Sequence, residues 1–278
     1  MALFLALAYI FAIILDLATA AWGGPFLAVW GVARMWSVAG AASLALLLRG
    51  EPVRASLRRW LSASGSTVKL YLVAPLVVYA ALGIYVALAY PVGVFDMGVA
   101  VGVIERSLKQ FLPPGEAARL APLVAYAQIA LAYVASVTVN ALAALGEELG
   151  WRGYLYEKLG GAPTLRNTVL VGVAWGFWHV PATLLLGYSY PTERVAGSVL
   201  YVAMCVAFTY PHLAAVSATR SVLPAASLHG AINALWPLTV VASPLPERSR
   251  ELYAGMGVLG FAAWAATSLA IYVVARRR

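Results

Sequence analysis

The stretch ALFLALAYIFAIILDLATAA, residues 2–21, decides the class of fold, because its only charged side chain is Asp16. A helix needs about 20 mostly apolar residues to cross the hydrocarbon core of a bilayer. The stretch lacks the basic start of a secretory signal peptide, and it is long for the apolar core of one. We therefore interpret it as a first membrane span that the mature protein retains.

Further apolar stretches follow, separated by breaks that contain Gly and Pro. The sequence predicts an all-α, polytopic membrane protein with about eight transmembrane helices, and we treat residues 1–278 as a single membrane domain. The predicted spans lie near residues 2–21, 26–48, 70–90, 121–145, 167–187, 196–218, 223–243 and 252–275.

The loop at residues 91–120 separates the third and fourth predicted spans. Within it, Glu105, Arg106 and Lys109 lie close to Phe111 in the sequence. This mixture of charged and apolar residues predicts a short amphipathic helix at the membrane interface.

The composition also indicates a membrane protein. Hydrophobic residues make up 63% of the chain and charged residues 11%, whereas soluble domains carry about 25% charged residues. The net charge of +8 lies mostly in loops, and no basic stripe interleaved with aromatic residues indicates a nucleic-acid partner. Cys205 is the single cysteine, which excludes an intrachain disulfide, and we expect it to be a small apolar core residue.

Lys and Arg residues are distributed unevenly between the two sets of loops. With eight spans both termini lie on one side, and that side carries twelve basic residues against six on the other. Because basic residues collect in cytoplasmic loops, we expect both termini to face the cytoplasm, and the opening of the active site with them.

Few ionisable residues lie at membrane depth, where they are costly and indicate a functional site by default. Asp16 and Arg34, in the first two predicted spans, could pair with each other. His212 follows Pro211 near the end of the sixth span, and we interpret it as an interfacial or hydrogen-bonded residue. The remaining candidates belong to the fourth, fifth and seventh spans.

The segment LGEELGWRG, residues 145–153, places two adjacent carboxylates at the end of the fourth span. Glu148 and Arg152 are four residues apart and share a helix face, so we expect them to pair. Glu147 lies about a quarter-turn away and is left free to act as a general base. The alternative is a salt bridge that only anchors the end of the helix.

Two histidines lie on other spans, His179 on the fifth and His229 on the seventh, where Asn233 shares the helix face of His229. Glu147 and His179 could activate a water molecule, and the other two side chains could donate to an oxyanion. Glu147, His179 and His229 also have the ligand types of a catalytic zinc site. The sequence leaves the metal-independent and the zinc mechanisms open.

These motifs, taken in order, resemble those of the CPBP family, which contains type II CAAX prenyl endopeptidases and bacteriocin-processing or immunity-type proteins. The family motif EExxxR falls at residues 147–152, FxxxH at 175–179 and HxxxN at 229–233. The resemblance covers about residues 120–243, the motif-bearing core. Trp175 stands where the family has Phe, an exchange expected to alter packing rather than chemistry.

The resemblance implies a role for each motif residue. Glu147 and His179 would activate the hydrolytic water, and His229 and Asn233 would form the oxyanion hole. Glu148 would support the site, together with the arginine of its own motif. The family is described as an eight-helix membrane protein whose site opens toward the cytoplasm.

Three functions follow from these observations. The first is an intramembrane endopeptidase that cleaves a peptide or lipidated protein, such as a prenylated one, entering from the plane of the bilayer. The second is an ion-coupled transporter, since buried Glu and His residues also serve as proton relays, although no matching halves with broken helices are evident. The third is a non-catalytic scaffold or immunity-type protein that retains the fold.

Overall fold

The computed structural model describes residues 1–277, the side chain of Pro25 excepted, and within them it contains helices and no strand. The predicted all-α class is therefore confirmed. A π-helical segment, η1 (Leu149–Leu155), follows α8. The α-helices are α1 (Ala2–Trp22), α2 (Gly24–Leu48), α3 (Val53–Trp60), α4 (Gly65–Val73), α5 (Leu76–Ala89), α6 (Met97–Leu108), α7 (Pro114–Ser136), α8 (Val139–Glu148), α9 (Tyr156–Lys158), α10 (Leu165–Leu186), α11 (Arg194–Thr219), α12 (Leu223–Leu235), α13 (Leu238–Val241), α14 (Glu247–Tyr253) and α15 (Val258–Arg276).

Seven helical stretches within the described residues are long and apolar enough to cross a membrane, so the chain is an integral multi-pass membrane protein. The sequence predicts about eight. The missing one is the span near 223–243, which is divided between α12, with 13 residues, and the four-residue α13. The predicted span near 121–145 is also interrupted, because the backbone of Thr138 leaves helical geometry between α7 and α8.

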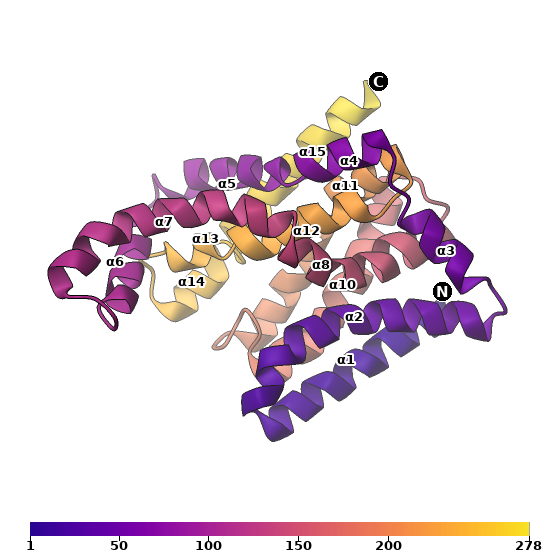
Figure 1. Cartoon of the computed structure of the whole chain (residues 1–278), viewed down its shortest axis with the longest axis horizontal. Helices are drawn as coiled ribbons and strands as arrows, with labels where there is room; N and C mark the ends of the chain where they lie inside the picture. Colours follow the sequence, from indigo (N-terminus) through magenta and orange to yellow (C-terminus); the bar gives the residue numbers. More distant parts are fainter. Residues whose placement is uncertain (278) are drawn as a thin grey trace.

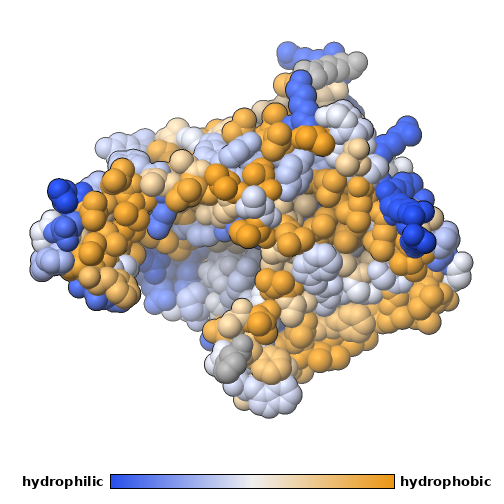
Figure 2. All heavy atoms as spheres, in the orientation of Figure 1, coloured by the Kyte–Doolittle hydropathy of each residue, from blue (hydrophilic) through white to orange (hydrophobic). Residues whose placement is uncertain are grey.

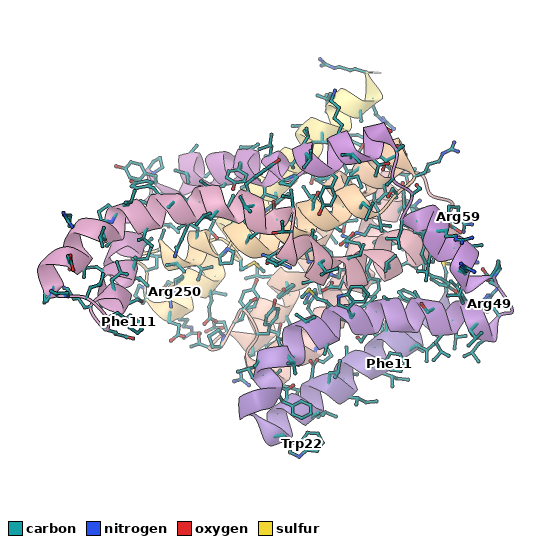
Figure 3. All side chains as sticks on the ribbon, viewed as in Figure 1. Phe11, Trp22, Arg49, Arg59, Phe111 and Arg250 are labelled. Atoms are coloured by element: carbon teal, nitrogen blue, oxygen red, sulfur yellow. The ribbon has the colours of Figure 1, made fainter. Side chains whose placement is uncertain are left out.

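The long helices run back and forth along the long axis of the molecule, and α8 continues beyond α7 toward α3 (Figure 1). Both termini lie at the end of the molecule that carries α3 (Figure 1). Arg49 and Arg59 also lie there, whereas Phe111 and Arg250 lie at the other end (Figure 3). Figure 2 shows apolar side chains over much of the surface between these ends, as contact with lipid requires.

Ion pairs hold α9, which follows η1, at the end of the molecule that carries Arg49 and Arg59 (Figure 3). Glu51 accepts a hydrogen bond from Lys158 at 2.6 Å and another from Arg49 at 2.9 Å. Glu157 pairs with Arg59 at 2.8 Å and accepts from the indole N–H of Trp60 at 2.7 Å. These contacts join α9 to α3 and to the connection between α2 and α3.

Glycines let the motif-bearing helices approach their neighbours closely, which is how small residues act at helix interfaces in membranes. A Cβ atom on Gly146 would lie 2.6 Å from the Cα of Trp36 in α2. One on Gly176 would lie 2.5 Å from the Cα of Val202 in α11. The helices that carry Glu147 and His179 are therefore seated directly against α2 and α11.

We expect Gly146→Ala to destabilise the protein, because the added methyl group would push α8 away from α2. Overpacking of this kind costs about 1–3 kcal/mol, and thermal unfolding of the purified protein would show it as a lower Tm. The matched control is Gly40→Ala, also in a helix interior, where a Cβ meets nothing within 4 Å. An unchanged Tm for Gly146→Ala would contradict the close contact.

Candidate active site

A cavity of ≈ 400 Å³ lies among α2, α8, α10, α11 and α12. Its lining includes Glu147, His179, His229 and Asn233. Three helices that are well separated in the sequence thus bring the predicted candidates to one cavity, which we call the central cavity.

Glu147 is 2% exposed, and a tryptophan holds its carboxylate. The indole N–H of Trp175 donates to Oε2 of Glu147 at 2.6 Å. Phenylalanine could not make this bond, so the expectation that Trp175 alters packing rather than chemistry is wrong. The other carboxylate oxygen remains available to a ligand in the central cavity.

The ring of His179 is fixed by contacts on α10 and α11. Its Nδ1 lies 3.0 Å from the backbone carbonyl of Trp175, and its ring stacks on that of Tyr201 with 4.3 Å between centroids. Because a carbonyl oxygen only accepts, Nδ1 carries the proton and Nε2 of the neutral ring is an acceptor. Cys205 is buried, as expected, and its Sγ lies 3.9 Å from Nδ1 of His179.

Glu148 faces away from the central cavity and joins two helices. Arg152 donates to its Oε1 at 2.9 Å, which confirms the predicted pair. Nδ1 of His229 lies 2.8 Å from the same oxygen. Since a carboxylate accepts, Nδ1 of His229 carries a proton and its Nε2 is left for the cavity. The guanidinium of Arg152 also lies over the ring of Trp175, 4.1 Å from its centroid.

His212, interpreted from the sequence as an interfacial or hydrogen-bonded residue, is fully buried in the protein. Its predicted hydrogen bond is present, because Nδ1 lies 2.8 Å from the carbonyl of Phe208. Within the described residues, Nε2 of His212, Oε2 of Glu148 and Nε of Arg152 are buried without a partner. A ring nitrogen of His212 lies within 4.8 Å of ligand atoms of Glu148 and His229, so His212 belongs to the support behind the central cavity.

A catalytic zinc ion fits the site poorly. Among the described residues, the group with ligand atoms within 4.8 Å of one another is Glu148, His212 and His229, not the predicted set of Glu147, His179 and His229. Glu148 is already paired with a guanidinium, which opposes a second cation. A catalytic zinc also needs an open position toward substrate, and only His229 of that group lines the cavity.

The amide of Asn233 is exposed where it lines the cavity. His229, one turn earlier on α12, is 5% exposed. The amide is therefore free to contact a bound ligand.

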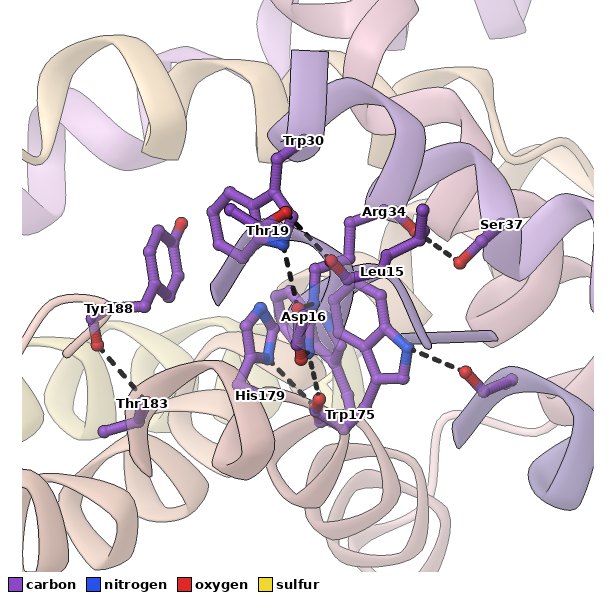
Figure 4. Close-up of polar contacts among 12 residues, drawn as sticks. Leu15, Asp16, Thr19, Trp30, Arg34, Ser37, Trp175, His179, Thr183 and Tyr188 are labelled. Atoms are coloured by element: carbon purple, nitrogen blue, oxygen red, sulfur yellow. Dashed lines mark hydrogen bonds and ion pairs between the residues drawn. The ribbon is translucent and has the colours of Figure 1, made fainter. Parts of the chain in front are cut away.

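The first fifty residues contribute one wall of the central cavity, which the sequence motifs did not reveal. Trp30 and Arg34 of α2 line it. Arg34 pairs with Asp16 of α1 at 2.9 Å, and both side chains are buried, so the predicted pair is confirmed. Trp30 also donates to Asp16 at 2.9 Å (Figure 4). The signal for this wall in the sequence was the pair of opposite charges, Asp16 and Arg34, in adjacent predicted spans.

The central cavity extends toward the end of the molecule opposite the termini. Its lining includes Tyr188 and Ser189, just beyond α10, and Met256, just before α15. Both connections lie away from the end that carries α3 and the two termini (Figure 1). The lining of the central cavity thus includes connections at the end of the molecule opposite the termini (Figure 1), and the cytoplasmic opening of the site stays a prediction.

Comparison with known proteins agrees with the motif residues. Residues 129–235 match the model of the family described as type II CAAX prenyl endopeptidase Rce1-like. CAAX prenyl protease 2 of Methanococcus maripaludis is 39% identical over 61 residues, which are 22% of this chain and 22% of that protein. The match thus spans about a fifth of the relative's length. No solved structure matches the chain.

The bond between Trp175 and Glu147 can be measured with a double-mutant cycle of Trp175→Phe and Glu147→Gln. We expect a coupling energy of about 1–3 kcal/mol in the free energy of unfolding, because a hydrogen bond to a charged group contributes this much. Trp151→Phe is the matched control, since the indole N–H of Trp151 has no partner among the described residues. A cycle with Trp175 that shows no more coupling than one with Trp151 would contradict the bond.

Proposed function

We propose that this chain, whose residues 129–235 form a domain of the type II CAAX prenyl endopeptidase Rce1-like family, is an intramembrane endopeptidase. The family is a peptidase family and is the one that the motifs predict. The observation that carries the proposal is the convergence of Glu147, His179, His229 and Asn233 on one central cavity. A general base, a second water acceptor and oxyanion donors are the groups that peptide hydrolysis requires.

Activation of water falls to Glu147 and His179. One oxygen of Glu147 is engaged by Trp175, so the other accepts a proton of the water. His179 accepts the second hydrogen at Nε2, because its Nδ1 proton faces the carbonyl of Trp175. The water oxygen keeps a lone pair for attack on the peptide carbonyl, and the proton passes to Glu147.

Asn233 and His229 stabilise the oxyanion. The exposed amide of Asn233 donates N–H directly. His229 donates from Nε2 when both ring nitrogens carry a proton, with Nδ1 held by Glu148 at 2.8 Å. When the intermediate collapses, Glu147 returns its proton to the departing amine, the C–N bond breaks and the base is regenerated.

The substrate class follows from the surroundings of the site. The central cavity lies among membrane helices and is lined by aromatic side chains such as Trp30, Trp178, Tyr188 and Trp236. An extended peptide with an apolar or lipidated segment suits such a lining. We propose a membrane-associated polypeptide, of which a prenylated protein is one case, that enters from the plane of the bilayer.

For the orientation, we propose that both termini are cytoplasmic. The end of the molecule that carries them also carries Arg49 and Arg59 (Figure 3), and basic residues collect in cytoplasmic loops.

The mechanism predicts that Glu147→Gln and His179→Ala each lower kcat by at least about 10²-fold, the usual contribution of a positioned acid or base. The measurement is cleavage of a fluorogenic lipidated peptide by the purified protein. Glu116→Gln, a change of an exposed carboxylate in α7, is the matched control and should keep the wild-type rate. A metal chelator should also leave the rate unchanged. Cleavage that survives both site variants would refute the mechanism.

The orientation predicts the sidedness of thiol labelling. In a Cys205→Ser background, we expect an impermeant maleimide added outside intact cells to label Ser107→Cys of α6 and not Ser62→Cys beside α3. Both positions are exposed, and the two elements lie at opposite ends of the molecule (Figure 1). The reverse pattern would place the termini outside.

A further inference from the structure

Arg34 is a charged side chain that the proposed hydrolysis does not use. It is 2% exposed, and it lines the central cavity together with Glu147 and His179. Its guanidinium lies over the ring of Trp178, 3.7 Å from the centroid, and that ring lies 4.8 Å from the ring of His179. Figure 4 shows Arg34 and Asp16 beside His179. A cation is therefore built into the wall next to the water-activating groups.

The contacts of Arg34 leave part of its guanidinium available. Nε donates to Oδ1 of Asp16 at 2.9 Å, and Nη2 donates to Oδ2 at 3.2 Å and to the carbonyl of Trp178 at 2.5 Å. Nη1 takes no part in these bonds. Asp16 accepts a third bond from Trp30, so its acceptor capacity is largely used. The pair thus fixes the guanidinium while Nη1 keeps two N–H donors.

The charge in the cavity indicates which ligand those donors suit. Arg34 is the one Lys or Arg among the described residues that line the cavity, and Glu147 is the one carboxylate. An anionic group of a substrate would be repelled by Glu147 and needs a cation beside it. Planar guanidinium donors match a carboxylate in both geometry and charge.

We propose that Arg34 binds the C-terminal carboxylate of the substrate segment that is cleaved off. This inference rests on the proposed endopeptidase function and adds its specificity-determining residue. A cavity of ≈ 400 Å³ is near the lower limit for drug-sized ligands, so it holds only a short segment beyond the scissile bond. The polypeptide then ends inside the cavity, and its terminal carboxylate is the anion that reaches Arg34.

The test compares two fluorogenic S-farnesylated CAAX peptides that differ only at the C-terminus, one a free acid and the other a primary amide. For the wild-type protein, we expect a KM about tenfold or more lower for the acid, the effect of one or two charge-assisted hydrogen bonds. Cleavage of both peptides with equal KM would overturn the role of Arg34 and leave the proposed function standing. Cleavage of neither would overturn the proposed function as well.

Variants locate the effect at Arg34. The double variant Asp16→Asn, Arg34→Gln removes both charges together, so no unpaired charge is buried, and it should show equal KM values for acid and amide. The matched control, Asp16→Asn alone, keeps the guanidinium and should keep the preference for the acid. A double variant that still prefers the acid would refute the inference. The inference would also be refuted if the double variant lowered kcat equally for both peptides and left the ratio of their KM values unchanged. That result would assign Arg34 to stabilisation of the oxyanion.

A measurement without variants covers the case in which these proteins fail to fold. The short C-terminal peptide acid released from the free-acid substrate and the corresponding amide are compared as competitive inhibitors of the wild-type protein. We expect the acid to bind about tenfold or more tightly. Equal inhibition constants would count against carboxylate binding.

Discussion

The carboxylate of Glu148 is the contact on which the geometry of the site depends. A buried charge is costly unless it is paired and hydrogen-bonded, and one oxygen of Glu148 meets both Arg152 and His229. Arg152 belongs to η1 and His229 to α12. The carboxylate of Glu148 therefore joins these two elements across the site. With Glu148 held in this way, its neighbour Glu147 faces the central cavity.

Close backbone contact between helices is the second feature on which the geometry of the site depends. Gly146 lets α8 lie against α2, and Gly176 lets α10 lie against α11. Because lipid provides no hydrophobic driving force between helices, such packing must supply much of the free energy of helix association. A π-helical segment directly after Glu148 widens the turns that carry Arg152. Wide turns of this type are frequent at functional sites.

The sequence predicted those parts of the protein that depend on local pattern or on the cost of burying charge. Seven of the predicted spans, the Glu148–Arg152 pair and the Asp16–Arg34 pair belong to this group. It did not predict features set by tertiary placement. The bond from Trp175 to Glu147 depends on the distance between α8 and α10, and the burial of His212 depends on the neighbours of α11.

The wall contributed by α2 has a consequence for what counts as the functional unit. The family-matched segment, residues 129–235, carries every motif residue, yet Trp30 and Arg34 of α2 form part of the same enclosure. If that segment alone were placed in another membrane protein, the wall formed by Trp30 and Arg34 would be missing. The central cavity would then be open to lipid on that side. The N-terminal helix pair is thus part of the enclosure of the central cavity as well as of the membrane-spanning structure.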